Sequence, residues 1–254
     1  MNKHLSYIFF ILIYISSNAQ QSKIEHYTFF SKSLEEERKI TLYFPENFKP
    51  ENRYNAVFCT DGQMINEYYK NKLDSVFASK SVNPFVMIGV NSNEELLPNS
   101  YIGYRQFEYI ENEPSDNPDL KSRFERHLKF FVYEVDEYLT EELNWQISNK
   151  YFYGVSNGAG FGVTLSTYYP ELFSKYILYS MGGENYKKLK WDPKKYPFFI
   201  IRCGNEKLVP FIDCSKKLSK YLSRKHYEHI FEIYNGGHNR EDWLNLFIAD
   251  IKNL

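Results

Sequence analysis

Short apolar runs alternate with longer segments of helical spacing along most of this chain, and few folds accommodate that alternation. Runs rich in β-branched and aromatic residues predict strands at Lys39–Phe44, Ala56–Cys59, Phe85–Val90, Lys150–Tyr153, Tyr176–Ser180, Phe198–Cys203 and His229–Tyr234. Apolar residues at three- and four-residue steps predict helices at Phe124–Leu143, Ala159–Tyr169, Val209–Arg224 and Glu241–Lys252. The alternation favours an α/β fold, with a mostly parallel central sheet and helices on both of its faces.

The part of the chain that carries this pattern is predicted to form one domain. No internal repeat, low-complexity tract or linker divides residues 20–254. The longest interruption is the polar segment Asn91–Pro118, which also holds Pro98 and Pro114 and predicts a long loop. Loops of this length are typically functional or disordered, so we expect this one to border a binding site.

Residues 1–19 have the layout of a secretory signal peptide. A positively charged start precedes the nearly unbroken apolar stretch Leu5–Ile15, and Ser17 and Ala19 are the small residues of a cleavage site. The apolar stretch is shorter than the roughly 20 residues that a membrane span needs. We expect a cleaved signal peptide and a secreted or periplasmic domain, residues 20–254, without stable membrane insertion. An uncleaved anchor is the alternative.

Charge and cysteine content exclude two further classes of protein. The 31 Lys and Arg against 32 Asp and Glu leave a net charge of -1, so no bulk field favours nucleic acid as a partner. Three cysteines are too few for a disulfide framework. We expect thiols at Cys59, Cys203 and Cys214, with a Cys203–Cys214 bridge as the alternative.

The motif with the most chemical content is Gly154-Val155-Ser156-Asn157-Gly158, a G-x-S-x-G segment between a predicted strand and a predicted helix. A tight strand-to-helix turn needs small neighbours and lifts the serine hydroxyl clear of the sheet edge. The backbone N–H of Asn157, at the start of the helix, would then face an oxyanion. We expect Ser156 to be a nucleophile. A Gly-rich turn with a structural serine is the alternative.

A nucleophilic serine needs a base, and in this type of site the order along the chain is Ser, acid, His. His238 follows the last predicted strand and is the expected base, with a surface-turn histidine as the alternative. Glu206 follows the strand before that one and is the expected acid, which would orient the His238 ring. Asp213, inside the next predicted helix, is the alternative acid, and either carboxylate could instead be a solvated surface group.

The loop after the predicted strand Ala56–Cys59 supplies a second oxyanion donor. Gly62 permits close approach of the backbone, and the N–H of Gln63 is the expected donor. An ordinary turn at Asp61-Gly62 is the alternative.

These motifs, in this order, resemble the α/β-hydrolase "putative esterase" family from about Thr28 to the C-terminus. The matching segments are Asp61-Gly62-Gln63, Arg105-Gln106-Phe107-Glu108-Tyr109, Gly154-Val155-Ser156-Asn157-Gly158, Tyr169-Pro170-Glu171-Leu172-Phe173, and Gly237-His238 with Trp243. The family includes esterase D-like enzymes, enterochelin-type siderophore esterases, feruloyl and acetyl xylan esterases, and the antigen 85 acyltransferases. Asn157 stands where the family usually carries Met, and Ala159 where Gly is common.

The resemblance implies an α/β-hydrolase fold and a serine carboxylic-ester hydrolase that forms an acyl-enzyme. In that scheme Ser156 is the nucleophile, His238 the base and Glu206 the acid, while the amides of Gln63 and Asn157 bind the oxyanion. No metal or cofactor is implied, and the sequence has no phosphate-loop motif or metal-spaced His/Cys/Asp cluster. Acyl transfer to an alcohol and a non-catalytic binding module of this fold are the alternatives.

The expected partner is a small-molecule or glycan-linked ester, and we expect Asp61, Arg105 and Tyr109 to contact it. Rings of the long loop can stack on a sugar or an aromatic acyl group, and Arg105 can hold an anionic group in a bidentate fork. The alternative is that Arg105 pairs with Glu108 and only fixes the loop. By family analogy, carbohydrate-linked, feruloyl or siderophore esters suit an exported enzyme of this kind.

Overall fold

The computed structural model describes residues 20–183, 189, 191–192, 194–205 and 209–253, and its centre is an eight-stranded sheet. The strands are β1 (Lys23–Ser31), β2 (Glu36–Phe44), β3 (Tyr54–Thr60), β4 (Val86–Val90), β5 (Ile147–Val155), β6 (Lys175–Tyr179), β7 (Phe198–Gly204) and β8 (His229–Tyr234). Their order across the sheet is β1-β2-β4-β3-β5-β6-β7-β8. Pairing is antiparallel from β1 to β2 and from β2 to β4, and parallel from β4 to β8.

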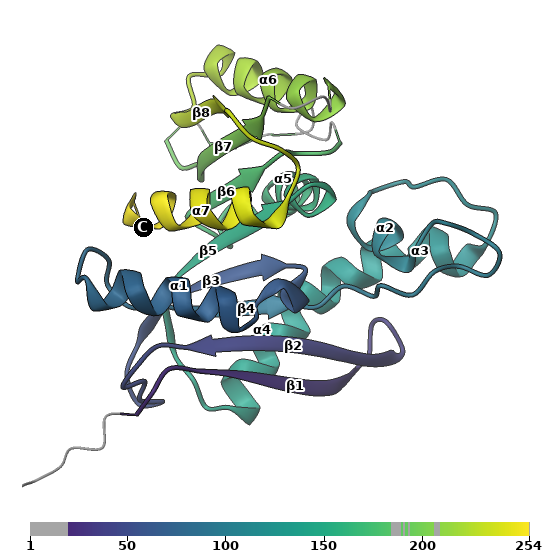
Figure 1. Cartoon of the computed structure of the whole chain (residues 1–254). Coiled ribbons are helices and arrows are strands. Elements are labelled where there is room, and N and C mark those ends of the chain that lie inside the picture. Colours follow the sequence, from purple (N-terminus) through teal and green to yellow (C-terminus); the bar gives the residue numbers. More distant parts are fainter. Residues whose placement is uncertain (1–19, 184–188, 190, 193, 206–208, 254) are drawn as a thin grey trace, which may run out of the picture.

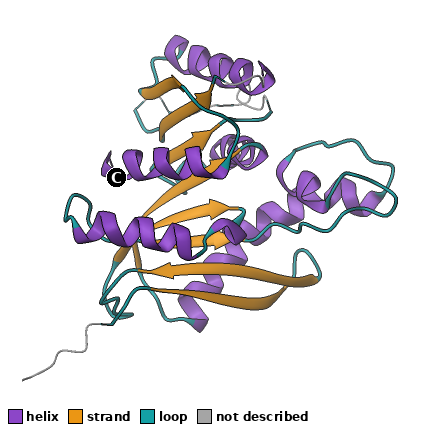
Figure 2. Ribbon diagram, in the orientation of Figure 1, coloured by secondary structure: helices purple, strands orange, loops and turns teal. Residues whose placement is uncertain are grey.

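Helices cover both faces of this sheet (Figures 1 and 2). They are α1 (Glu67–Ala78), α2 (Tyr104–Tyr109), α3 (Pro118–Lys129), α4 (Val135–Glu137), α5 (Asn157–Tyr168), α6 (Val209–Arg224) and α7 (Arg240–Asp250). Short 3₁₀ turns follow β3 (η1, Gly62–Met64) and α7 (η5, Ile251–Asn253). The mostly parallel sheet covered on both faces confirms the predicted fold class.

Two separate apolar cores form, one on each face of the sheet. On one face, Phe131 and Phe161 pack at 5.2 Å between ring centres and belong to a large cluster that also receives α6. On the other face, α1 and α7 lie over the sheet, and Phe247 of α7 packs 4.5 Å from Tyr153 of β5. Burial of rings on both faces explains why the central strands are apolar along their whole length.

The helix predicted at Phe124–Leu143 is present but longer at its N-terminus. It begins at Pro118, because the Asn117 side chain caps the Asp119 amide at 2.9 Å and Pro118 occupies the first turn. Helical structure then runs without a break to Glu142 through two wide π-type turns.

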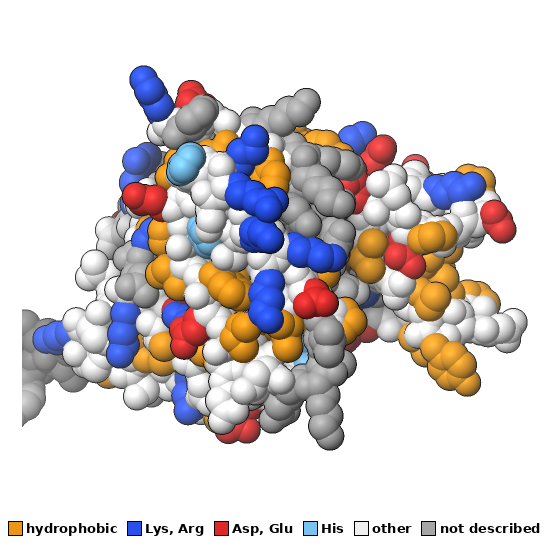
Figure 3. Space-filling model, turned by 90° about the horizontal axis from the view of Figure 1, so that it is seen from above, with side chains coloured by type: hydrophobic (Ala, Val, Ile, Leu, Met, Phe, Trp, Pro, Cys, Tyr) orange, Lys and Arg blue, Asp and Glu red, His pale blue; other side chains and the backbone are white. Residues whose placement is uncertain are grey.

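The long loop expected at Asn91–Pro118 is partly ordered into structure. It contains α2 and an antiparallel bridge between Leu96 and Gly103. This segment projects from the body of the molecule (Figures 1 and 3). Its Leu96, Tyr101 and Ile102 side chains are exposed. In Figure 1 the arrowhead of β3 points toward the projection, which therefore stands at the end where the parallel strands finish.

The described residues give two further findings, one on the cysteines and one on membrane-spanning helices. No disulfide joins Cys203 to Cys214, so the bridge considered above is wrong and both side chains are thiols. No helix in the described ranges combines the length and the apolar character that crossing a membrane requires.

Candidate active site

Ser156 occupies a sharp turn between the end of β5 and the first residue of α5. Its backbone has φ 56° and ψ −127°, and its amide donates to the carbonyl of Tyr179 on β6 at 2.9 Å. A Cβ added at Gly154 would lie 2.5 Å from the carbonyl oxygen of Gly158, so the turn closes only around a glycine. The predicted strand–turn–helix context of the motif is therefore present.

His238 lies in the turn between β8 and α7 and faces Ser156. Its Nε2 is 3.1 Å from the Ser156 Oγ, which is hydrogen-bond distance. The imidazole stacks on Phe211 of α6 at 4.5 Å and meets the edge of Trp243 of α7 at 4.7 Å. These two rings fix the plane of the imidazole. The Trp243 position was part of the sequence motif, whereas no sequence signal distinguished Phe211.

The environment keeps the imidazole neutral. Burial lowers the pKa of His238 below its ordinary value, and the positive charge of Arg105 lowers it further. The Nδ1 atom is buried and has no hydrogen-bond partner among the described residues. A neutral ring with Nε2 on a serine hydroxyl can accept a proton, and its unmatched Nδ1 has room for an orienting acceptor.

The predicted acid Glu206 lies outside the described residues, but the chain that leads to it is well placed. The Asn205 amide donates to the Tyr234 carbonyl at 3.0 Å. A Cβ at Gly204 would lie 2.5 Å from the Gly236 carbonyl oxygen, so the end of β7 touches the turn that carries His238. The alternative acid, Asp213, is on α6 with an exposed side chain.

The segments that carry the two predicted oxyanion donors pack close together, because Gly158, next to Asn157, lies against the side chains of Thr60 and Asp61. Gly62 in η1 packs so closely on Gly89 that a Cβ has no room, and Gly158 of α5 packs equally closely on Thr60 of β3. The Gln63 side chain is fixed by Ser92, which accepts from Nε2 at 2.7 Å and donates its amide to Oε1 at 3.2 Å.

At the start of α5 the first helical hydrogen bonds run from the amides of Ala159 and Gly160 to the Ser156 carbonyl. The Asn157 amide precedes them, in the part of a helix whose N–H groups have no partner within the helix. The dipole of α5 adds a partial positive charge at the same end.

Asp61, Arg105 and Tyr109, the three residues predicted to contact substrate, bind one another in the structure. Arg105 donates to both Asp61 carboxylate oxygens, from Nε at 2.5 Å and from Nη2 at 2.8 Å. The Asp61 amide donates to the Tyr109 hydroxyl at 3.0 Å, and the guanidinium lies 4.8 Å from the Tyr109 ring centre. The bidentate fork that was expected to hold an anionic ligand therefore holds Asp61.

The ion pair of Arg105 is with Asp61, whereas the alternative considered above was a pair with Glu108. Glu108 is fully buried and pairs with Arg38 of β2 and Arg123 of α3. Arg123 also binds Glu36 at 2.6 Å, so one buried ionic cluster ties α2 and α3 to β2. The opposite charges hold the pKa of Glu108 down at about 2 despite its burial, so the carboxyl is ionised.

A small pocket of about 140 Å³ lies beside Ser156. It is lined by Tyr109, Ile110, Glu111, Asn157, Gly160, Val163, Thr164, Met181, Gly182 and Gly183. In the described part of the chain, no three His, Cys, Asp or Glu side chains gather as metal ligands would.

The chain is similar to known proteins over most of its length. The family model described as "Putative esterase" matches residues 31–196. The uncharacterized protein YjcH of Bacillus subtilis (strain 168) is 21% identical over 253 residues, which cover 91% of this chain and 97% of that protein.

Solved structures share the fold at low sequence identity. A ferulic acid esterase from Anaeromyces mucronatus, in complex with ferulic acid, has a TM-score of 0.68 and 15% identity, over 93% of this chain and 92% of that one. The siderophore hydrolase EstA from Aspergillus nidulans has a TM-score of 0.71 and 14% identity, over 98% of this chain and 99% of that one.

Proposed function

The chain belongs to the esterase family whose model covers residues 31–196, the carboxylic ester hydrolases, and from this premise we propose that Ser156 and His238 carry the reaction. Its fold is the α/β-hydrolase fold predicted from the sequence. The observation that carries the proposal is the 3.1 Å contact of His238 Nε2 with Ser156 Oγ, at a strained turn next to an unsatisfied helix start.

The reaction proceeds in two steps of acyl transfer. The Ser156 Oγ attacks the ester carbonyl carbon while His238 Nε2 takes its proton. The tetrahedral intermediate then collapses, and the same proton passes to the leaving alcohol, which departs and leaves an acyl-serine. Water attacks the acyl-serine, again losing a proton to His238, and the acid is released as Ser156 regains its proton.

The negative charge of each tetrahedral intermediate is stabilised by the backbone amides of Gln63 and Asn157. Both are fixed before substrate arrives, Gln63 through its side-chain bonds to Ser92 and Asn157 through its place at the start of α5. A preorganised donor of this kind is worth about 10²–10³ in rate.

Glu206 is our choice for the third member of the triad. The turn that carries His238 touches the end of β7, and Glu206 follows that strand by two residues. His238 Nδ1 is buried without a partner among the described residues, and a carboxylate there would fix the tautomer that leaves Nε2 free to accept a proton.

We assign Asp61 and Arg105 the role of positioning the oxyanion loop. Asp61 is itself in the left-handed region, with φ 56°, and directly precedes Gly62 and Gln63. Its carboxylate is held by Arg105 and its amide by Tyr109, so both ends of this strained residue are fixed. Removing either contact lets the Gln63 amide move away from the oxyanion.

The substrate class is a small ester whose acyl or alcohol part is aromatic or linked to a carbohydrate or siderophore. The solved relatives named above are a ferulic acid esterase and a siderophore hydrolase, both acting on such esters by their names. The pocket beside Asn157 gives part of the substrate a place next to the reacting serine.

Hydrolysis of p-nitrophenyl acetate and butyrate tests the nucleophile. We expect Ser156→Ala to lower kcat by at least about 10⁴, because the hydroxyl that forms the acyl-enzyme is gone. The matched control is Ser166→Ala on the same helix, whose buried hydroxyl bonds only the Val163 carbonyl among the described residues, and it should keep the wild-type rate. Equal rates for folded wild type and Ser156→Ala would contradict the proposal.

Glu206→Gln and Asp213→Asn separate the two candidate acids in the same assay. Glu206→Gln should reduce kcat by on the order of 10⁴, since an amide holds the His238 ring in the wrong tautomer. Asp213→Asn should leave kcat unchanged, because its side chain is exposed on α6. The reverse result would assign the acid to Asp213.

A further inference from the structure

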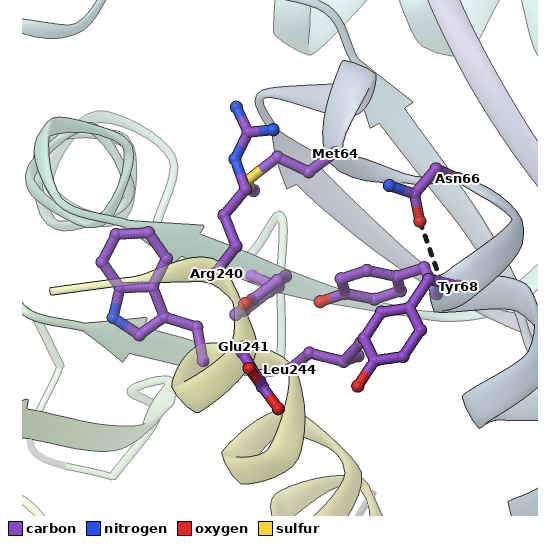
Figure 4. Close-up of a pocket in the computed structure, with 9 residues that line it drawn as sticks. Met64, Asn66, Tyr68, Arg240, Glu241 and Leu244 are labelled. Atoms are coloured by element: carbon purple, nitrogen blue, oxygen red, sulfur yellow. Dashed lines mark hydrogen bonds between the residues drawn. The ribbon is translucent and has the colours of Figure 1, made fainter. Parts of the chain in front are cut away.

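A second pocket, of about 400 Å³, lies on the face of the sheet that α1 and α7 cover (Figure 4). It is lined by Met64, Asn66, Tyr68, Tyr69, Tyr153, Arg240, Glu241, Trp243 and Leu244. Some residues that line it are close in sequence to residues of the candidate active site. Met64 directly follows Gln63, and Arg240 follows His238 by two residues. The pocket is therefore a neighbour of the reacting centre and shares none of the residues that line the pocket beside Asn157.

The size and lining of this pocket suit an aromatic ring. Small-molecule sites usually occupy about 300–1,000 Å³ and are lined mainly by apolar and aromatic side chains. Three tyrosines and one tryptophan, with a methionine and a leucine, make up most of the lining here. Offset or edge-on contacts between such rings and a ligand ring are favourable by about 0.5–1.5 kcal/mol each.

Most polar groups of the lining are hydrogen-bond donors. The Tyr69 hydroxyl and the Trp243 indole N–H are both buried, and they interact with the side chains of Tyr153 and Tyr234 respectively. The Asn66 side-chain oxygen already accepts from the Tyr69 amide at 3.1 Å, which leaves its NH₂ group to donate. The Asn66 NH₂ group and the Arg240 guanidinium are donors in this lining, and a ligand with acceptor oxygens suits both of them.

Arg240 supplies the positive charge of the pocket. Figure 4 shows its side chain extended toward Met64, while the Glu241 carboxylate points the other way. Arg240 is exposed and makes no ion pair with another residue of the described ranges. A guanidinium that pairs with no described residue, at the rim of an aromatic pocket, is suited to a carboxylate, which it can bind in a bidentate fork.

We propose that this pocket binds a small aromatic carboxylate, with its ring among Tyr68, Trp243 and Leu244 and its carboxylate on Arg240. The site is additional to the one proposed for ester hydrolysis, and binding there needs no reaction at Ser156. It is nonetheless connected to that site, because Trp243 forms both a wall of the pocket and the edge-on contact with His238 at 4.7 Å.

Calorimetric titration of folded Ser156→Ala protein with benzoate tests the proposal without any turnover. Benzyl alcohol, which has the ring without the charge, serves as the neutral ligand. Arg240→Gln in the same background should weaken benzoate binding by at least roughly tenfold, because a charged hydrogen bond is lost, and should not change benzyl alcohol binding. Tyr68→Ala, which removes a half-exposed ring of the wall, should weaken both ligands.

Arg224→Gln on α6 is the matched control, an exposed arginine away from the pocket lining, and should bind benzoate like the parent protein. The proposal is overturned if benzoate does not bind at millimolar concentration, or if Arg240→Gln binds it as well as Arg224→Gln does. These readouts are independent of esterase activity, so a failure of the hydrolytic mechanism would not be mistaken for a failure of this site.

Discussion

Ser156 holds a backbone conformation that most residues avoid, and its neighbours explain how the strain persists. Such conformations cost about 1–3 kcal/mol and last only where surrounding contacts fix them. The Ser156 amide donates to the Tyr179 carbonyl, and the Ser156 carbonyl accepts from Ala159 and Gly182. Backbone contacts from α5 and from the end of β6 thus fix the turn that presents the hydroxyl.

Arg105 connects the position of the oxyanion loop with the protonation of the base, and substitution there separates the two effects. Arg105→Gln should lower kcat for p-nitrophenyl acetate between about ten- and a hundredfold, because the loop after Asp61 loses its anchor. It should also move the acid limb of kcat/KM to higher pH. The charge of Arg105 lowers the pKa of His238, so without it the base becomes protonated at a higher pH.

Arg105→Lys is the informative partner of that variant. Lysine keeps the charge but cannot form the bidentate fork to Asp61, so it should lose rate while the acid limb stays near its wild-type position. A full pH–rate profile of the three proteins decides the matter. Wild-type kcat in Arg105→Gln would contradict the positioning role, and an unmoved limb would contradict the electrostatic one.

At the scale of elements, the buried strands and the edge strand β8 were predicted, whereas β1 at the opposite edge of the sheet was not. The predicted run at Phe85–Val90 coincides with β4 to within one residue, and the residues of β4 are buried throughout. β1 escaped prediction because its charged and aromatic residues alternate between exposed and half-buried positions. α1 escaped for a related reason, since only Tyr69 and Leu73 of its twelve residues are buried.

Some features of the candidate site could likewise be predicted from the sequence, and others could not. Ser156 and His238 were identified from local motifs, because a strained turn needs particular small residues close by in the sequence. The ion-pair partner of Arg105 was not identified from the sequence. Asp61 is 44 residues away, whereas Glu108, the partner considered from the sequence, is only three residues away. Glu108 is instead neutralised by Arg38, 70 residues away, and no local pattern encodes a pairing set by the sheet order.

His127 lies on α3, where that helix meets the ionic cluster around Glu108. This histidine should make the stability of the folded protein sensitive to acid. His127 is fully buried, and neither ring nitrogen has a hydrogen-bond partner among the described residues. Burial lowers the pKa of His127 to about 3, with Glu108 acting in the opposite direction. As pH falls from about 6.5 toward 3, the unfolded chain binds a proton there and the folded chain does not, so stability falls.

His127→Phe, which keeps a ring among Phe130, Phe131 and Phe161, should remove this part of the acid sensitivity. The free energy of unfolding, measured by urea titration at pH 7, 6 and 5, should fall by about 2 kcal/mol less in the variant than in wild type between pH 7 and 5. The exposed His226→Asn is the matched histidine control. Parallel pH dependences for wild type and His127→Phe would mean that His127 is protonated in the folded protein.

At the scale of the whole molecule, the site is assembled where several strands end together. Ser156 follows β5, His238 follows β8, Gln63 follows β3, and the chain toward Glu206 leaves β7. Helices on both faces hold these strand ends in register, and the ionic cluster joins the projecting segment to the antiparallel edge. The first strand of the described residues is β1, which begins at Lys23.

From their sequence, we predict that residues 1–19 are dispensable for folding and direct export. A chain of residues 20–254 retains every strand and helix given above, together with the contact between the Asn47 amide and the Gln20 carbonyl. We expect it to unfold at the same temperature as full-length protein and to hydrolyse p-nitrophenyl butyrate at the same rate. Thermal unfolding followed by circular dichroism and the esterase assay provide the two measurements.

Export is tested by fusing residues 1–19 to alkaline phosphatase lacking its own signal, a reporter that is active only outside the cytoplasm. We expect phosphatase activity in intact bacteria and a reporter whose N-terminus has lost residues 1–19. Ile11→Asp with Ile13→Asp interrupts the apolar stretch and should abolish both results, because a signal peptide depends on that stretch. An active but uncleaved fusion would identify residues 1–19 as an anchor, and equal activity with the two aspartates would refute the export signal.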